Sequence, residues 1–225
     1  RVSHGYIEAE AGGGRLKGAH LYLDFASVGA TENLMMAAVL ARGVTVIDNA
    51  AKEPEIVDLA DFLTRMGASI SGAGASTIEI KGVESLGGVD HRVIGDRIEA
   101  GTLLMAGAIT RGEVEVKGFN PSYIEIVLDK LAECGCEIER GTDRAAVRVP
   151  GELSGVDFQT LPYPGFPTDL QPPMVALLAT ARGTSFVTEN IFDNRFMVVD
   201  ELNRLGADIR TQDHHAIIKG VDRLS

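Results

Sequence analysis

A repeat of about 70 residues constrains the fold of this chain more than any other feature of its sequence. The motif Ala41-Arg42-Gly43 returns as Thr110-Arg111-Gly112 and again as Ala181-Arg182-Gly183. Two further markers follow the same period, namely a glycine after an apolar helical pattern (Gly67, Gly135 and Gly206) and the related segments 82–86 (GVESL) and 220–224 (GVDRL). Self-similarity of this kind is typical of a chain built from one repeated supersecondary unit.

Each repeat has the same predicted order of elements. A short strand such as 20–23 precedes a helix such as 32–42, and a strand such as 44–47 follows the repeat glycine. A second helix carries apolar residues at a period close to 3.6, for example at Ile56, Leu59, Phe62, Leu63 and Met66. Two strands close the unit. The pattern predicts an α/β (α+β) fold made of βαβαββ units.

Three such units are predicted, over residues 17–86, 87–153 and 154–225. One unit cannot bury both faces of its helices, so the units must pack against one another. Residues 1–16, with Gly5-Tyr6-Ile7-Glu8-Ala9, are interpreted as the last strand of an earlier unit, and Ser225 falls where a further unit would begin. We therefore expect an interior fragment of a longer protein.

Charge and hydropathy narrow the classes of partner. The 225 residues carry a net charge of −11, which argues against a nucleic-acid ligand because such ligands need a basic face. Small anions remain possible, since helix N-termini bind phosphate whatever the global charge. No apolar run approaches the ~20 residues of a membrane span, and no secretory signal is visible at Arg1. We expect no membrane association.

The cysteines and histidines predict no metal site. Cys134 and Cys136 form no disulfide framework, which favours a reducing, cytoplasmic compartment. They match core positions of the other repeats, and a C-x-C pair without further ligands is a weak metal signal. His214 and His215 have no third ligand nearby and are interpreted as a surface pair.

The repeats differ most where helices begin. Fourteen residues before the repeat glycine stand Gly29, Ile98 and Asp169; sixteen before it stand Ser27, Asp96 and Pro167; twelve after it stand Glu55, Ile124 and Arg195. Such unlike chemistry at equivalent helix starts predicts a site to which several repeats contribute.

Each of these helix starts has a functional and a structural interpretation. The small residues Ser27, Val28 and Gly29 suit a phosphate cradle or an ordinary serine cap. Asp96 and Glu99 are interpreted as a capping box, with Arg97 as a candidate cleft residue. Arg195 suits a planar anion or a surface salt bridge.

The segment 161–172 (LPYPGFPTDLQP) leads into the first helix of the last repeat. Three prolines and a glycine keep it out of regular structure before Thr168 and Asp169. Backbone N–H groups are free at such a helix start. The Asp169 carboxylate is therefore either a cap or a base that takes a proton from a hydroxyl group.

The chain resembles the UDP-N-acetylglucosamine enolpyruvyl transferase family from Gly5 to Leu224. Five segments carry the resemblance, in order: 27–33 (SVGATEN), 49–58 (NAAKEPEIVD), 96–102 (DRIEAGT), 166–171 (FPTDLQ) and 194–197 (NRFM). The related shikimate-pathway transferase would share the repeat but not these segments. The resemblance implies six repeats in two lobes, each an inside-out α/β barrel, with residues 1–94 in the first lobe and 95–225 in the second.

The resemblance also implies an activity. The family moves enolpyruvyl from phosphoenolpyruvate to the 3′-hydroxyl of UDP-N-acetylglucosamine by addition and elimination, releasing phosphate, in the first committed step of peptidoglycan synthesis. No cofactor is implied. Residue by residue, Ser27, Val28 and Gly29 would hold the diphosphate, and Thr168 and Asp169 would bind the sugar. Asp169 would act as general base, Ile191 and Phe192 would line the sugar pocket, and Arg195 would sit near the reacting groups.

The chain also departs from the family pattern. Phe25 stands where relatives carry Lys, and neither cysteine matches the family's catalytic cysteine on an upstream mobile loop. The Lys-Asn pair and the arginines that grip phosphoenolpyruvate also fall outside the chain. The remainder of the same polypeptide is thus an expected partner, and the fragment alone is expected to be inactive. A non-catalytic repeat module that binds a ligand or protein, or a transferase with another acceptor, are the alternatives.

Overall fold

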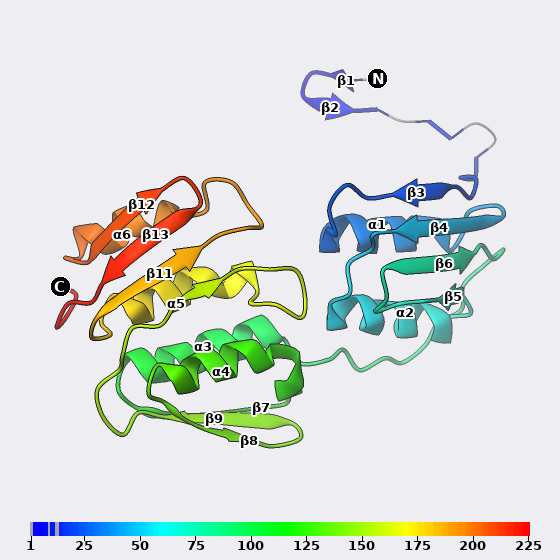
Figure 1. Cartoon of the computed structure of the whole chain (residues 1–225). Helices are drawn as coiled ribbons and strands as arrows, with labels where there is room; N and C mark the ends of the chain where they lie inside the picture. Colours follow the sequence, from blue (N-terminus) through cyan, green and yellow to red (C-terminus); the bar gives the residue numbers. More distant parts are fainter. Residues whose placement is uncertain (1, 9, 12–13) are drawn as a thin grey trace. The chain divides into compact units, whose positions relative to one another are not determined.

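The chain forms two compact units, Arg1–Val93 and Ile94–Ser225, in a computed structural model that describes residues 2–8, 10–11 and 14–225 (Figure 1). None of the described helices has the length and apolar character needed to cross a bilayer.

The first compact unit contains one complete βαβαββ repeat. Its elements are β3 (His20–Tyr22), α1 (Val28–Ala38), β4 (Val44–Asp48), α2 (Pro54–Arg65), β5 (Ser69–Ser71) and β6 (Thr77–Lys81). The sheet order is β3-β4-β6-β5, with β3 parallel to β4 and the other pairs antiparallel. Alternate strand residues are buried, as a sheet with helices on one face requires; Ile47 lies opposite Ile78, and both are fully buried.

The second compact unit contains two repeats. The first consists of α3 (Arg97–Ile109), β7 (Glu113–Lys117), η1 (Pro121–Ile124), α4 (Glu125–Glu133), β8 (Glu137–Arg140) and β9 (Arg144–Arg148). The second consists of β10 (Phe158–Gln159), η2 (Thr168–Leu170), α5 (Gln171–Leu178), β11 (Thr184–Thr188), α6 (Met197–Arg204), β12 (Asp208–Gln212) and β13 (His215–Lys219). The two sheets, β7-β9-β8 and β10-β11-β13-β12, share one core with the helices, in which Leu104, Leu128 and Leu177 are fully buried. The predicted α/β fold of repeated units is confirmed.

Two of the repeat markers have a common physical cause. Gly82 N donates to Gly43 O (2.9 Å), and at the equivalent place Gly220 N donates to Gly183 O (3.0 Å). A Cβ added to Gly82 would overlap the Ala41 carbonyl oxygen, and one added to Gly220 would overlap that of Ala181. After the last strand of the unit, the chain passes so close to the residues just before the repeat glycine that only a glycine fits at positions 82 and 220.

Three sequence expectations are corrected. The repeat at 87–153 lacks its first strand, because residues 82–96 connect the two compact units and β7 forms a ladder only with β9 among the described residues. Helix α1 spans Val28–Ala38 rather than residues 32–42, since Ser27 already caps its start and the helix ends four residues earlier than predicted. In place of one strand, residues 1–16 contain the hairpin β1 (Val2–Ser3) and β2 (Tyr6–Ile7), which turns at Gly5 with φ +81°; Ala9 lies outside the described residues.

Candidate functional site

The proline-rich segment is held in place before it reaches Thr168. Leu161 N donates to Phe166 O (3.1 Å), and the buried Phe166 ring lies 4.4 Å from the Phe158 ring, centroid to centroid. Thr168 and Asp169 then form the turn η2 at the start of α5. The predicted entry of a loop into a helix is confirmed, and both side chains follow a segment that these contacts hold in place.

Asp169 pairs with Arg195 rather than capping a helix. Arg195 Nη2 donates to Asp169 Oδ1 at 2.5 Å, and no side-chain cap is formed at η2 or α5. The Asp169 side chain is 58% exposed and that of Arg195 is 30% exposed. The carboxylate therefore keeps an open side that an incoming ligand can reach.

Arg195 lies in the loop between β11 and α6, where it has a second contact. Its guanidinium carbon lies 4.9 Å from the centroid of the Phe192 ring, an arrangement that favours the cation. The sequence predicts that the second helix of this repeat begins within residues 193–196; this start is corrected, because α6 begins only at Met197 and Asn194 adopts φ +60°. The loop thus brings Phe192 and Arg195 to the Asp169 carboxylate.

Glu189 also belongs to this cluster, although the sequence did not predict it. Its carboxylate is almost fully buried and accepts hydrogen bonds from Thr168 Oγ1 (2.9 Å), Ile191 N (2.9 Å) and Phe192 N (3.2 Å). It thereby links Thr168 to the loop that carries the other predicted pocket residues. A comparison of the residues six positions beyond each repeat glycine would have identified it. The other two repeats carry Asn49 and Gly118 there, so a glutamate at this position is unusual among the three.

Ser27, Val28 and Gly29 belong to the first compact unit, whereas the Asp169–Arg195 pair belongs to the second. Ser27 Oγ accepts a hydrogen bond from Ala30 N (3.3 Å). Ser27 therefore caps α1, which is one of the two interpretations of this segment. Val28 and Gly29 are the first residues of α1, and the space beside Gly29 is open. The helix start therefore offers backbone N–H groups to an anion.

The family model of EPSP synthase (3-phosphoshikimate 1-carboxyvinyltransferase) matches residues 1–225. The chain belongs to the EPSP synthase family. A UDP-N-acetylglucosamine 1-carboxyvinyltransferase from Nocardia farcinica (strain IFM 10152) is 55% identical over 224 residues, which are 100% of this chain and 52% of that protein. A UDP-N-acetylglucosamine 1-carboxyvinyltransferase 1 from Symbiobacterium thermophilum is 60% identical over 222 residues, covering 98% of this chain and 50% of that protein.

Solved structures agree with this family. The enolpyruvyl transferase NikO from Streptomyces tendae superimposes with a TM-score of 0.79 at 25% identity, covering 92% of this chain and 52% of NikO. EPSP synthase from Acinetobacter baumannii gives a TM-score of 0.68 at 21% identity, covering 94% of this chain and 50% of that one, and supports the fold alone. The chain spans about half the length of the curated relatives it matches.

Asp96 has a structural role, because its side chain caps the start of α3. Asp96 Oδ1 accepts hydrogen bonds from Ile98 N (2.8 Å) and Glu99 N (3.0 Å), so the Asp96 half of the predicted capping box is confirmed. Arg97 is buried, and its guanidinium carbon lies 5.5 Å from the centroid of the Tyr163 ring. Arg97 thus packs on the proline-rich segment that leads to Thr168.

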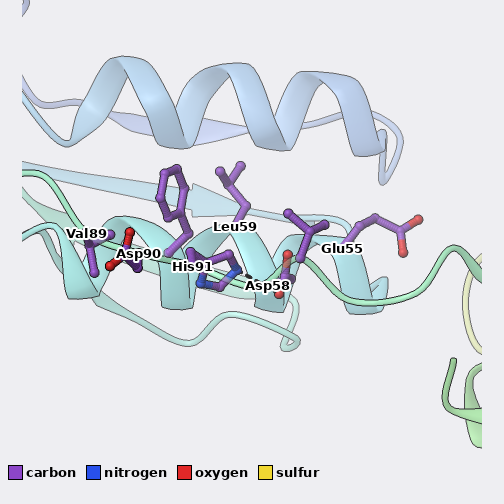
Figure 2. A pocket seen from close by; sticks show the side chains of 8 residues that line it. Glu55, Asp58, Leu59, Val89, Asp90 and His91 are labelled. Atoms are coloured by element: carbon purple, nitrogen blue, oxygen red, sulfur yellow. Dashed lines mark hydrogen bonds and ion pairs between the residues drawn. The ribbon is translucent and has the colours of Figure 1, made fainter. Parts of the chain in front are cut away.

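A pocket of about 490 Å³ in the first compact unit contains a buried histidine (Figure 2). Arg65 Nη1 lies 3.2 Å from His91 Nδ1. Because a guanidinium only donates, Nδ1 accepts and Nε2–H donates to Asp58 Oδ1 at 3.1 Å. Arg65 also donates to Asp90 O (2.7 Å). These bonds fasten residues 90–91 onto α2 and give His91 and Asp58 a structural role.

The two cysteines lie in the core, as predicted. Both are free and buried, and Cys134 Sγ donates to Ser154 O (2.9 Å). Burial raises the pKa of the Cys134 thiol to about 12 and that of Cys136 to about 11. His214 and His215 are exposed, as expected of a surface pair. Among the described residues, no group of three or more His, Cys, Asp and Glu side chains is arranged to hold a metal ion.

The raised thiol pKa values predict lower stability at alkaline pH. The folded chain keeps protons that the unfolded chain, with a thiol pKa near 9.0, releases. This contribution to stability is therefore complete below pH 9 and is lost as the pH rises towards 11 and 12. The urea midpoint should fall more between neutral pH and pH ~10 in the wild type than in a Cys134→Ala, Cys136→Ala double variant. Equal falls in both would show that the thiols do not cause the loss.

Proposed function

We propose that the protein containing this chain transfers the enolpyruvyl group of phosphoenolpyruvate to the 3′-hydroxyl of UDP-N-acetylglucosamine and releases phosphate, in the first committed step of peptidoglycan synthesis. The observation that carries the proposal is the 55% identity over the whole chain to a UDP-N-acetylglucosamine 1-carboxyvinyltransferase. The proposal concerns the whole protein because the chain spans about half the length of such relatives.

The Asp169–Arg195 pair supports the chemistry of addition followed by elimination. In the addition, the sugar oxygen bonds to C2 of phosphoenolpyruvate while its proton leaves and C3 gains a proton. In the elimination, C3 loses a proton and the C2–O bond to phosphate breaks. Asp169, with its open side, is the base for the sugar hydroxyl. Arg195 keeps further N–H donors for an anionic group beside it.

The remaining site residues have binding roles in this proposal. Thr168 contacts the sugar together with Asp169, and the half-buried Ile191 and the exposed Phe192 line the sugar pocket. The start of α1, at Ser27, Val28 and Gly29, holds the diphosphate through backbone N–H groups and the helix dipole.

The rest of the same polypeptide completes the enzyme in this proposal. Residues 1–94 belong to its first lobe and residues 95–225 to its second. The two substrates are phosphoenolpyruvate and UDP-N-acetylglucosamine, no cofactor takes part, and the family's catalytic cysteine comes from outside the present chain. Two buried free thiols favour a cytoplasmic location.

Phosphate release by the intact protein tests the proposal. We expect release when phosphoenolpyruvate and UDP-N-acetylglucosamine are both present, and none with either substrate alone. The control acceptor is 3-phosphoshikimate, the substrate in the name of the family model. Release with 3-phosphoshikimate instead would assign another acceptor, and no release with either acceptor would favour a non-catalytic repeat module.

A further inference from the structure

Glu189 is a buried carboxylate that joins three segments of the second compact unit. It follows β11 directly and is 1% exposed. Its Oε1 accepts from Thr160 Oγ1 (2.8 Å), Ile191 N (2.9 Å) and Phe192 N (3.2 Å), and its Oε2 accepts from Thr168 Oγ1 (2.9 Å). One side chain thus forms hydrogen bonds to the end of β10, to the turn η2 and to the loop before α6.

The backbone around Glu189 is also hydrogen-bonded to neighbouring segments. Glu189 N donates to His214 O (2.8 Å), and Asn190 N donates to Thr160 Oγ1 (2.9 Å). Asn190 Nδ2 also donates to Thr160 O (3.1 Å). A carboxylate is costly to bury unless donors surround it, and here four donors do so. The arrangement therefore permits little rearrangement of Thr168 relative to Ile191 and Phe192.

The repeat architecture does not require a carboxylate at this position. The equivalent residues of the other two repeats are Asn49 and Gly118, which turn the chain with positive φ angles of 56° and 89°. Glu189 is not among the described residues with positive φ. The last repeat departs from the others in both residue type and backbone conformation, at the point where the candidate site residues converge.

The bond to Glu189 determines what Thr168 can recognise. A threonine hydroxyl has one proton and two acceptor lone pairs. A carboxylate only accepts, so the Thr168 proton points to Glu189 Oε2. The hydroxyl oxygen is then left as an acceptor for a ligand, and it selects a ligand that offers an O–H or N–H group.

We propose that Glu189 is a positioning residue for the acceptor sugar. It orients the Thr168 hydroxyl as a hydrogen-bond acceptor for an O–H or amide N–H of the sugar, and it holds Ile191 and Phe192 beside the Asp169–Arg195 pair. The inference rests on the proposed function, because it assigns Thr168 to the sugar subsite of that reaction.

Glu189→Gln in the intact protein tests the inference. The amide has nearly the same volume, and its oxygen still accepts from the three Oε1 donors, but its NH₂ group donates to Thr168 Oγ1. The Thr168 proton then turns toward the ligand. We expect KM for UDP-N-acetylglucosamine to rise about tenfold, with KM for phosphoenolpyruvate unchanged. The Kd of the nucleotide sugar, measured by calorimetry, should weaken by a similar factor.

A double-mutant cycle separates positioning from general damage. In a Thr168→Val background, which removes the hydroxyl, Glu189→Gln should change KM for the nucleotide sugar far less than in the wild type. Glu201→Gln, a matched change of an exposed carboxylate paired with Arg204, controls for loss of charge. Unchanged sugar binding in Glu189→Gln, or equal effects in both backgrounds, overturns the role of Glu189 while the proposed function stands. A wild-type protein that binds no nucleotide sugar overturns both.

Discussion

Replacing Asp169 by Ala lowers kcat of the intact protein at least ~100-fold in the proposed transfer, the lower limit of what a positioned general base contributes. The carboxylate is exposed enough to meet a sugar hydroxyl, and its partner Arg195 remains to bind anions. The loss should fall on turnover and not on folding. An exposed ion pair of this kind contributes only about 0–1 kcal/mol to stability.

Asp169→Asn distinguishes the base from the ion pair. The amide oxygen can still accept a hydrogen bond from Arg195, but the side chain can no longer take a proton. We expect turnover in Asp169→Asn to be as slow as in Asp169→Ala, measured as phosphate released with both substrates saturating. Glu201→Ala, which removes the carboxylate of the exposed Glu201–Arg204 pair in the same compact unit, should retain wild-type turnover. Near-normal rates in Asp169→Asn would remove proton transfer from the role of this residue.

Replacing Phe166 by Ala lowers the free energy of unfolding of the second compact unit by ~3–5 kcal/mol. Phe166 is 2% exposed and packs against Phe158 at the end of the proline-rich segment. Truncation leaves a cavity in a core that is close-packed. The loss is a large part of the ~5–15 kcal/mol that stabilises a typical domain.

Denaturant unfolding of the intact protein measures this loss, with Phe186→Ala as the matched control. Phe186 lies on the neighbouring strand β11 but is 54% exposed, so its removal should change stability by only about ±0.5 kcal/mol. Similar shifts in the two variants would mean that Phe166 does not anchor the segment. Because Phe166 stands two residues before Thr168, the same variant should also weaken nucleotide-sugar binding.

Features that depend on near neighbours in the chain could be predicted from the sequence. The period of the apolar residues and the repeat glycines predicts the order of elements, since helices and strands follow from local spacing. The Asp96 cap was predicted because its partners, Ile98 N and Glu99 N, are two and three residues away. The core position of Cys134 followed from comparison with the equivalent residues of the other repeats.

The start of α1 and the repeat at 87–153 could not be predicted as well. Several small residues after Ser27 are compatible with a helix or a loop, and the Ser27 cap determines where the helix begins. The missing first strand beside β7 depends on which segment the tertiary structure brings to that edge. The spacing of apolar residues within 82–96 does not indicate whether this segment pairs with β7.

The sequence by itself determined the repeated βαβαββ plan, the family, and the loop and helix start that carry Thr168 and Asp169. Only the tertiary structure decided that Asp169 pairs with Arg195, 26 residues away. It also decided that Glu189 accepts a hydrogen bond from the hydroxyl of Thr168, 21 residues away. The physical reason is the range of the interactions. Periodicity and caps act within one or two turns of chain, whereas the partner of a side chain across a loop is set by how sheets and helices pack.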